Sequence, residues 1–179
     1  MFLRDACKIV QEYGDCLKST ISTNIEQPKC TQNLKEQLTD DVYKQAAISK
    51  VASYPRCKNT NAIKHALMNY GPLLASVKWY DDFTIDNKGL LHMNTNTDYG
   101  YHAIMIYGWN EHGWLCQNSW GKTWNGDGRF KYPYTSPFTE AWSFVDAANS
   151  DIIIPTKSSI LNIFYRIINR IINFLKGRG

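Results

Sequence analysis

The first stretch of the chain has apolar residues at helical spacing. Between Phe2 and Tyr13 they recur every three to four positions, which predicts an amphipathic helix. Gly14 follows at the position where a left-handed C-cap would end such a helix. Residues 17–41 are polar, contain Pro28 and show no sustained period, so we expect a linker there.

A second helix is predicted after a segment, 43–55, that has weak strand character. Thr60 or Asn61 would cap its N-terminus, and Gly71-Pro72 would end it. Between these two signals the apolar residues fall on one stripe of a helix: Ile63, Ala66, Leu67 and Tyr70.

The remaining body contains short runs that are typical of β-strands. These runs lie at residues 73–80, 89–93, 102–107, 114–118 and 129–132, and the stretch DDFTIDNKG between the first two is expected to be a loop. Because a Gly-containing turn separates the third run from the fourth, these two runs predict a hairpin. One helix combined with several antiparallel strands predicts an α+β fold.

The basic residues are unevenly distributed along the chain. The formal net charge is +4, from 20 basic and 16 acidic residues. The segment after Pro155 holds five of the basic residues and no acid: Lys157, Arg166, Arg170, Lys176 and Arg178. The rest of the chain therefore has 15 basic and 16 acidic residues, a net charge of −1, and this balance argues against a nucleic-acid partner for the body.

Residues 155–179 form a segment of a different kind. Apolar residues from Ile160 to Leu175 surround a narrow seam of Asn, Arg and Lys at three-to-four spacing, which predicts an amphipathic basic helix. Arg166 and Arg170 argue against a span of the bilayer, because a span needs about 20 predominantly apolar residues. We expect a helix that lies in the plane of a membrane surface or packs on a partner surface.

The cysteines exclude two common motifs. There are five, an odd number with no CxxC pair, so a zinc ribbon and a thioredoxin-like site are excluded, and we expect no metal and no cofactor. The chain has no Asn-x-Ser/Thr sequon, and its start, MFLRDACKIV, lacks the apolar core and cleavage site of a signal peptide. The compartment stays open, apart from peripheral membrane association through the C-terminal helix.

The predicted hairpin brings together two residues that can handle a proton. His102 lies near the start of one strand and Asn118 at the end of its neighbour, so their side chains could meet across the hairpin. An imidazole exchanges protons near neutral pH, and an amide oxygen that accepts from one ring nitrogen would orient the other toward a thiol or hydroxyl. Judged by spacing alone, such a pair is more often structural than catalytic.

The residues around this pair change that interpretation. GYHAIMIYGW, followed by WLCQNSWGKTWNGDGRF, resembles the papain-like cysteine peptidases, whose His precedes an Ala and an apolar run and whose Asn lies in an NSWGxxW segment. The resemblance extends to YGPLLASVKWYDDF, KGLLHM and FKYPYTSPFTEAWSF, and RDACKIVQEYGDC resembles the helix after the nucleophile region. It implies the family's right-hand domain, an antiparallel β-barrel or sheet with flanking helices, plus a remnant of the left-hand helical domain.

The resemblance implies roles for five residues. His102 would be the general base and the ion-pair partner of a thiolate, Asn118 would orient its ring, and Trp120 would cover their contact from water. Tyr101 and Ala103 flank His102 where the family lines its substrate cleft, so they would shape substrate preference. The substrate would be a peptide or protein, and the reaction would be the hydrolysis of a peptide bond.

The nucleophile side of such a site is missing from the pattern. The chain contains no C-G-S-C-W-like segment and no oxyanion-hole Gln before one. Cys7 would lie inside the first helix, Cys16 would follow its turn, and Cys116 occupies a position that is usually buried and aliphatic in the family. Cys30 and Cys57 would be either a disulfide pair or free thiols.

We therefore expect three segments: a left-hand remnant and linker at 1–40, a right-hand domain with the His and Asn at 41–154, and the amphipathic helix at 155–179. The expected function is the His/Asn half of a cysteine-type endopeptidase, active only if a Cys-bearing half is supplied by another chain or by sequence before Met1. The alternative is a catalytically inactive homologue that binds peptides or associates with a membrane.

Overall fold

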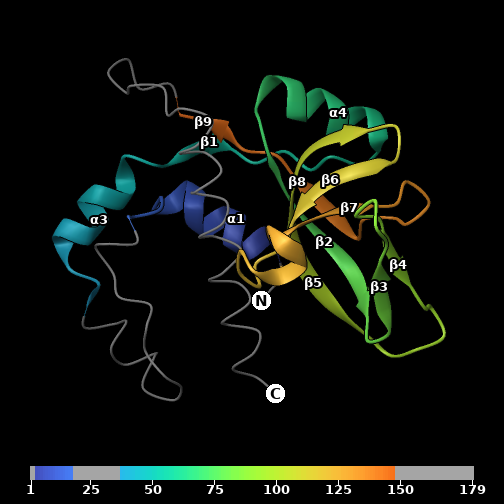
Figure 1. Cartoon of the computed structure of the whole chain (residues 1–179). Coiled ribbons are helices and arrows are strands. Elements are labelled where there is room, and N and C mark those ends of the chain that lie inside the picture. Colours follow the sequence, from blue (N-terminus) through green and yellow to red (C-terminus); the bar gives the residue numbers. More distant parts are fainter. Residues whose placement is uncertain (1–2, 18–36, 148–179) are drawn as a thin grey trace.

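The computed structural model describes residues 3–17 and 37–147, and an antiparallel sheet of five strands forms its centre (Figure 1). The strand order is β7-β6-β5-β2-β8. The bounds are Leu73–Tyr80 for β2, Tyr99–Asn110 for β5, Gly113–Gln117 for β6, Arg129–Tyr132 for β7 and Glu140–Trp142 for β8. Two smaller sheets pair β1 (Val51–Ser53) with β9 (Val145–Asp146), and β3 (Phe83–Ile85) with β4 (Leu91–Met93).

Helices pack on both faces of the central sheet. These are α1 (Leu3–Glu12) on one face and α4 (Thr60–Asn69) on the other, whereas α3 (Asp40–Ala47) buries Val42 and Ala46 in a separate small cluster with Cys16. A short 3-10 helix, η1, lies at Trp124–Gly126. Successive side chains of a strand point to opposite faces. Leu74 and Ala103 accordingly share one apolar cluster with α1, whereas Ala75 and Ile104 share the other with α4.

Several predicted elements are confirmed. The runs at 73–80 and 129–132 are the strands β2 and β7, and the predicted hairpin is formed by β5 and β6. The first helix ends at Glu12, and Gly14 follows it in the predicted left-handed conformation, with a φ of 83° and an N–H that donates to the carbonyl of Val10 at 3.0 Å. Only glycine fits there without strain, because a Cβ on Gly14 would lie 1.8 Å from the carbonyl oxygen of Ala46.

Three local predictions are wrong. Residues 43–55 are not mainly strand: α3 occupies 40–47, since Thr39 caps it by accepting from the Val42 N–H, and only 51–53 form a strand. The cap of α4 is Asn59 rather than Thr60 or Asn61. The stretch DDFTIDNKG contains the short strand β3, because its apolar residues pair with β4.

Other predictions fall outside the described residues. These include the amphipathic helix of 155–179, Cys30 and most of the linker at 17–41. Within the described ranges, no helix combines the length and apolar character that crossing a bilayer requires.

Candidate active site

The register of the central sheet places His102 and Asn118 at the same end of the hairpin. His102 lies on β5 opposite Val77 of β2, and Asn118 follows directly after β6, whose last residue, Gln117, pairs with Met105. The backbone N–H of Asn118 donates to the carbonyl of Gly128 at 2.9 Å. The backbone of Asn118 is therefore held by the strand pairing of Gln117 on one side and by the chain after η1 on the other.

A hydrogen bond joins the two side chains. The Nε2 of His102 lies 2.9 Å from the Oδ1 of Asn118, and the backbone N–H of Ser119 donates to the same Oδ1 at 2.8 Å. A backbone N–H can only donate, so this contact fixes which amide atom is the oxygen. Nε2 of His102 must then carry the proton, and Nδ1 is the nitrogen that would accept one in the neutral ring.

Indole rings surround the imidazole. The ring of Trp120 lies 5.0 Å from that of His102, and the ring of Trp79 lies 4.9 Å from it at an interplanar angle of 65°. Trp79 and Asn118 are buried, whereas Trp120 is 37% exposed and forms the outer edge of this group. The hydrogen bond thus lies in an environment of low polarity, where such bonds are stronger than in water.

The two predicted substrate-contacting residues lie on the other face of β5. Ala103 is buried in the apolar cluster that contains α1, whereas Ile104, its neighbour in the strand, belongs to the opposite cluster. Tyr101 is 61% exposed and its ring lies 5.9 Å from that of Tyr99. The structure therefore brings His102, Asn118 and Trp120 together and places Tyr101 and Ala103 behind them. A contact of these two residues with substrate stays a prediction.

The cysteines that the structure describes do not resemble an activated nucleophile. Cys7 and Cys116 are fully buried; burial, aided by the charge of Glu140, raises the pKa of Cys7 to about 12, and burial alone raises that of Cys116 strongly. Burial also raises the pKa of Cys57. A catalytic thiolate needs the opposite shift, toward a lower pKa.

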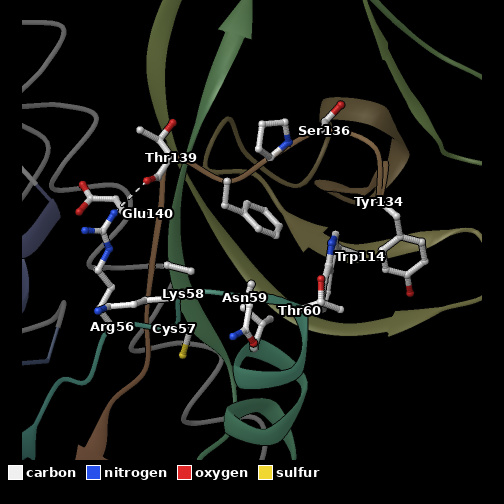
Figure 2. Close-up of a pocket in the computed structure, with 14 residues that line it drawn as sticks. Arg56, Cys57, Lys58, Asn59, Thr60, Trp114, Tyr134, Ser136, Thr139 and Glu140 are labelled. Atoms are coloured by element: carbon white, nitrogen blue, oxygen red, sulfur yellow. Dashed lines mark hydrogen bonds between the residues drawn. The ribbon is translucent and has the colours of Figure 1, made fainter.

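A separate cavity of about 400 Å³ lies at the N-terminus of α4 (Figure 2). Its wall includes Arg56, Trp114, Tyr134 and Thr139, and Arg56 donates to the Thr139 carbonyl at 3.2 Å. None of the five predicted site residues lines this cavity. Across residues 3–17 and 37–147, no group of three or more His, Cys, Asp and Glu side chains is arranged to hold a metal.

One residue beside His102 does not follow from the sequence pattern. Trp79 belongs to a run, LLASVKWY, that predicts only a buried strand. Its contact with His102 depends on the pairing of β2 with β5, and strand register is not visible in one sequence. The alternation Val77, Trp79 on one face is the only signal that could have placed it.

Comparisons with known proteins show which proteins this chain is similar to. The model of the papain family of cysteine proteases matches residues 3–137. Cathepsin B-like cysteine proteinase 3 of Caenorhabditis elegans is 32% identical over 110 residues, which cover 58% of this chain and 30% of that protein. Cathepsin B-like cysteine proteinase 1 of Haemonchus contortus is 30% identical over 125 residues, 66% of this chain and 34% of that protein. The chain thus spans about a third of the length of these curated relatives.

Solved structures show the same fold. Xylellain, a cysteine protease from Xylella fastidiosa, superposes with a TM-score of 0.67 at 20% identity, over 82% of this chain and 62% of that one. The Carica candamarcensis cysteine protease CMS1MS2 superposes with a TM-score of 0.52 at 15% identity, over 78% of this chain and 66% of that one. The sheet and helices described above are an α+β fragment of the papain-like fold, as the sequence predicted.

Proposed function

The chain belongs to the papain family of cysteine proteases, and from this membership we propose that His102 and Asn118 form the proton-handling half of a cysteine peptidase site. The observation that carries the proposal is the 2.9 Å hydrogen bond from the Nε2 of His102 to the Oδ1 of Asn118. It holds the imidazole in the tautomer whose Nδ1 can take a proton from a thiol.

The chemistry would proceed in two stages. In the first, the thiol of a cysteine passes its proton to Nδ1 of His102, the sulfur bonds to the peptide carbonyl carbon, the C–N bond breaks, and His102 returns the proton to the leaving amine. In the second, His102 takes a proton from water, the resulting hydroxide attacks the thioester carbonyl, the C–S bond breaks, and the leaving sulfur regains the proton from His102. Asn118 keeps the ring oriented through both stages and stabilises the imidazolium.

Because none of the chain's five cysteines lies in a C-G-S-C-W-like segment, the cysteine would come from outside the residues of this chain. The four described cysteines are buried or half-buried, and where a shift is resolved the thiol pKa is raised. The proposed active species therefore combines this chain with a Cys-bearing helix and an oxyanion-hole donor, supplied by a preceding segment or by a separate chain.

A complementation assay tests this proposal. The chain alone, and the chain fused behind the Cys-bearing domain of a cathepsin B-like relative, are incubated with a fluorogenic dipeptidyl substrate. We expect hydrolysis only by the fusion, and loss of that hydrolysis in His102→Ala. His112→Ala is the matched control, because His112 is an exposed histidine in the turn of the same hairpin.

Two results would contradict the proposal. Hydrolysis by the chain alone that disappears in a Cys→Ala variant would mean that the nucleophile is one of its own cysteines. A folded fusion without activity would favour the second candidate, an inactive homologue that holds peptides without cleaving them. The buried thiols are the observation that keeps this second candidate open.

We also propose that residues 155–179 attach the chain to an anionic membrane surface. The support is the sequence pattern alone, five basic residues without an acid beside a wide apolar face.

A further inference from the structure

We propose that Trp79 is a positioning residue, which together with Trp120 confines the imidazole of His102 so that its Nε2 stays on Asn118. The arrangement of the three rings supports this role. His102 has one indole at 4.9 Å and another at 5.0 Å, and those two indoles lie 5.3 Å apart at an interplanar angle of 72°. The imidazole is therefore in contact with two indole rings that also pack against each other.

The sheet register explains why Trp79 leans toward His102. Trp79 lies opposite Gly100, which has no side chain, and His102 is the diagonal neighbour, opposite Val77. A Cβ built on Gly100 would have no atom within 4 Å, so the indole is not packed over that glycine. Large aromatic side chains can reach a diagonal neighbour across an antiparallel pair.

Trp79 is also the centre of the aromatic group rather than its edge. Its ring contacts five other aromatic rings: Phe83, His102, Trp120, Trp124 and Phe130. It is 7% exposed, whereas Trp120 is 37% exposed. Without Trp79, the main ring beside the imidazole would be Trp120, which borders solvent. Trp79 contacts the imidazole from the buried side.

The unpaired indole N–H of Trp79 indicates that this position needs a large ring and not simply an apolar side chain. The Nε1 of Trp79 is buried and has no hydrogen-bond partner within the described part of the chain. A buried donor without an acceptor lowers stability, and Leu or Phe would fill an apolar core without that cost. An indole at this position is accounted for by its reach to His102.

The inference concerns the His102–Asn118 pair itself, and it rests on the proposed function only for its consequence in catalysis. A ring that rotates away from Asn118 loses the tautomer that proton transfer from a thiol needs. Trp79 touches no reacting atom in this scheme. It acts through His102.

Nuclear magnetic resonance of the full chain, labelled with ¹⁵N at histidine, tests the proposal. The readout is the exchange with water of the His102 proton on Nε2, which reports how often the bond to Asn118 opens. In Trp79→Leu we expect exchange faster by about tenfold. Trp79→Phe should give a smaller increase. Trp109→Leu is the matched control, because Trp109 packs on the same apolar cluster away from His102, and it should leave the rate unchanged.

Folded Trp79→Leu with wild-type exchange would overturn the proposal. If Trp79→Leu does not fold, Trp79→Phe decides: faster exchange supports the role and an unchanged rate overturns it. In the wild-type chain, nuclear Overhauser contacts between the rings of Trp79 and His102 are expected, and their absence overturns it. The exchange measurement needs no nucleophile, so a failed peptidase assay would not contradict this inference. An unchanged exchange rate would likewise not contradict the proposed peptidase function.

Discussion

At the scale of single residues, Asn118 joins three parts of the chain in a space that water barely reaches. Its Oδ1 accepts from His102 and from Ser119, its backbone N–H donates to Gly128, and the residue is 1% exposed. Removing this side chain would leave two donors without their acceptor. A buried donor in that state costs more than the original bond contributed.

Asn118→Ala should therefore destabilise the fold as well as the site. We expect the free energy of unfolding to fall by about 1–3 kcal/mol, measured by urea denaturation. Asn96→Ala, at an exposed loop position, is the control and should change it little. Equal unfolding free energies of the two variants would mean that the hydrogen bonds of Asn118 do not contribute to stability.

The buried thiol of Cys7 should make the free energy of unfolding fall as the pH rises above 9. Burial, with the charge of Glu140, raises its pKa from the usual 9.0 to about 12 in the folded chain. Above pH 9 the unfolded chain loses this proton and the folded chain keeps it, so stability should fall by about 1.4 kcal/mol per pH unit between pH 9 and about 12 from this residue.

The check is the slope of unfolding free energy against pH in urea titrations. In Cys7→Ala, the fall of the unfolding free energy above pH 9 should be shallower by about 1.4 kcal/mol per pH unit. Between pH 7 and 8 the two slopes should agree, whatever the variant's overall stability. Parallel curves above pH 9 would refute the assignment.

The residues of the site differ in how far the sequence could predict them. The NSWGKTW segment is enough to predict that Asn118 meets His102. The proton position on His102 depends on the backbone N–H of Ser119, which no side-chain pattern marks. Trp79 escapes prediction because its role arises from pairing between strands that are far apart in the chain.

At the scale of elements, α4 shows how one capping residue sets a boundary. The side chain of Asn59 accepts from the Ala62 N–H at 2.9 Å, so the helix starts one residue earlier than a cap at Thr60 predicts and two residues earlier than a cap at Asn61 predicts. All three residues are acceptable caps in isolation. The choice among them depends on the extended backbone of Asn59, with φ −152° and ψ 170°.

Asn59→Ala should lower the free energy of unfolding by about 1 kcal/mol, because it removes the acceptor for one unpaired helix N–H. Asn61→Ala is the matched control: the same residue type, two positions along, inside the helix. It should be neutral or slightly stabilising, since Ala has the higher helix propensity. A larger loss from Asn61→Ala than from Asn59→Ala in chemical denaturation would reverse the assignment.

Strands were easier to predict than the helix at 40–47. The β2 and β7 runs are apolar or alternating and bounded by turn residues, so both ends are marked. In α3 the capping signal at Thr39, with Asp40 and Asp41 in the first turn, is embedded in a polar stretch. Only two of its residues, Val42 and Ala46, are buried, so its apolar stripe is too narrow to stand out.

At the scale of the whole molecule, the body and the segment after Pro155 differ in net charge. The body has a net charge of −1 and the segment after Pro155 carries +5, so attraction to an anionic surface would come from the tail. The α+β class was predictable because the motifs span most of 2–148. The division at residues 40 and 154 stays a prediction.

The full chain should co-sediment with vesicles that contain phosphatidylserine. Replacing two of the tail arginines, Arg166→Gln with Arg170→Gln, should weaken this binding about 30-fold, since each base near the surface contributes about 1 kcal/mol. Lys44→Gln with Lys64→Gln, in the body, removes the same charge and should have little effect. If both double variants bind alike, the tail is not the anchor.

The alternation along β5 has a consequence for how such a chain can evolve. Tyr101, His102 and Ala103 are consecutive in the gene, but the first and third lie on the opposite face of the sheet from the second. A codon change at Tyr101 can alter the exposed surface without disturbing the indoles around His102. Substitutions at the exposed Tyr101 and substitutions around His102 can therefore accumulate at different rates.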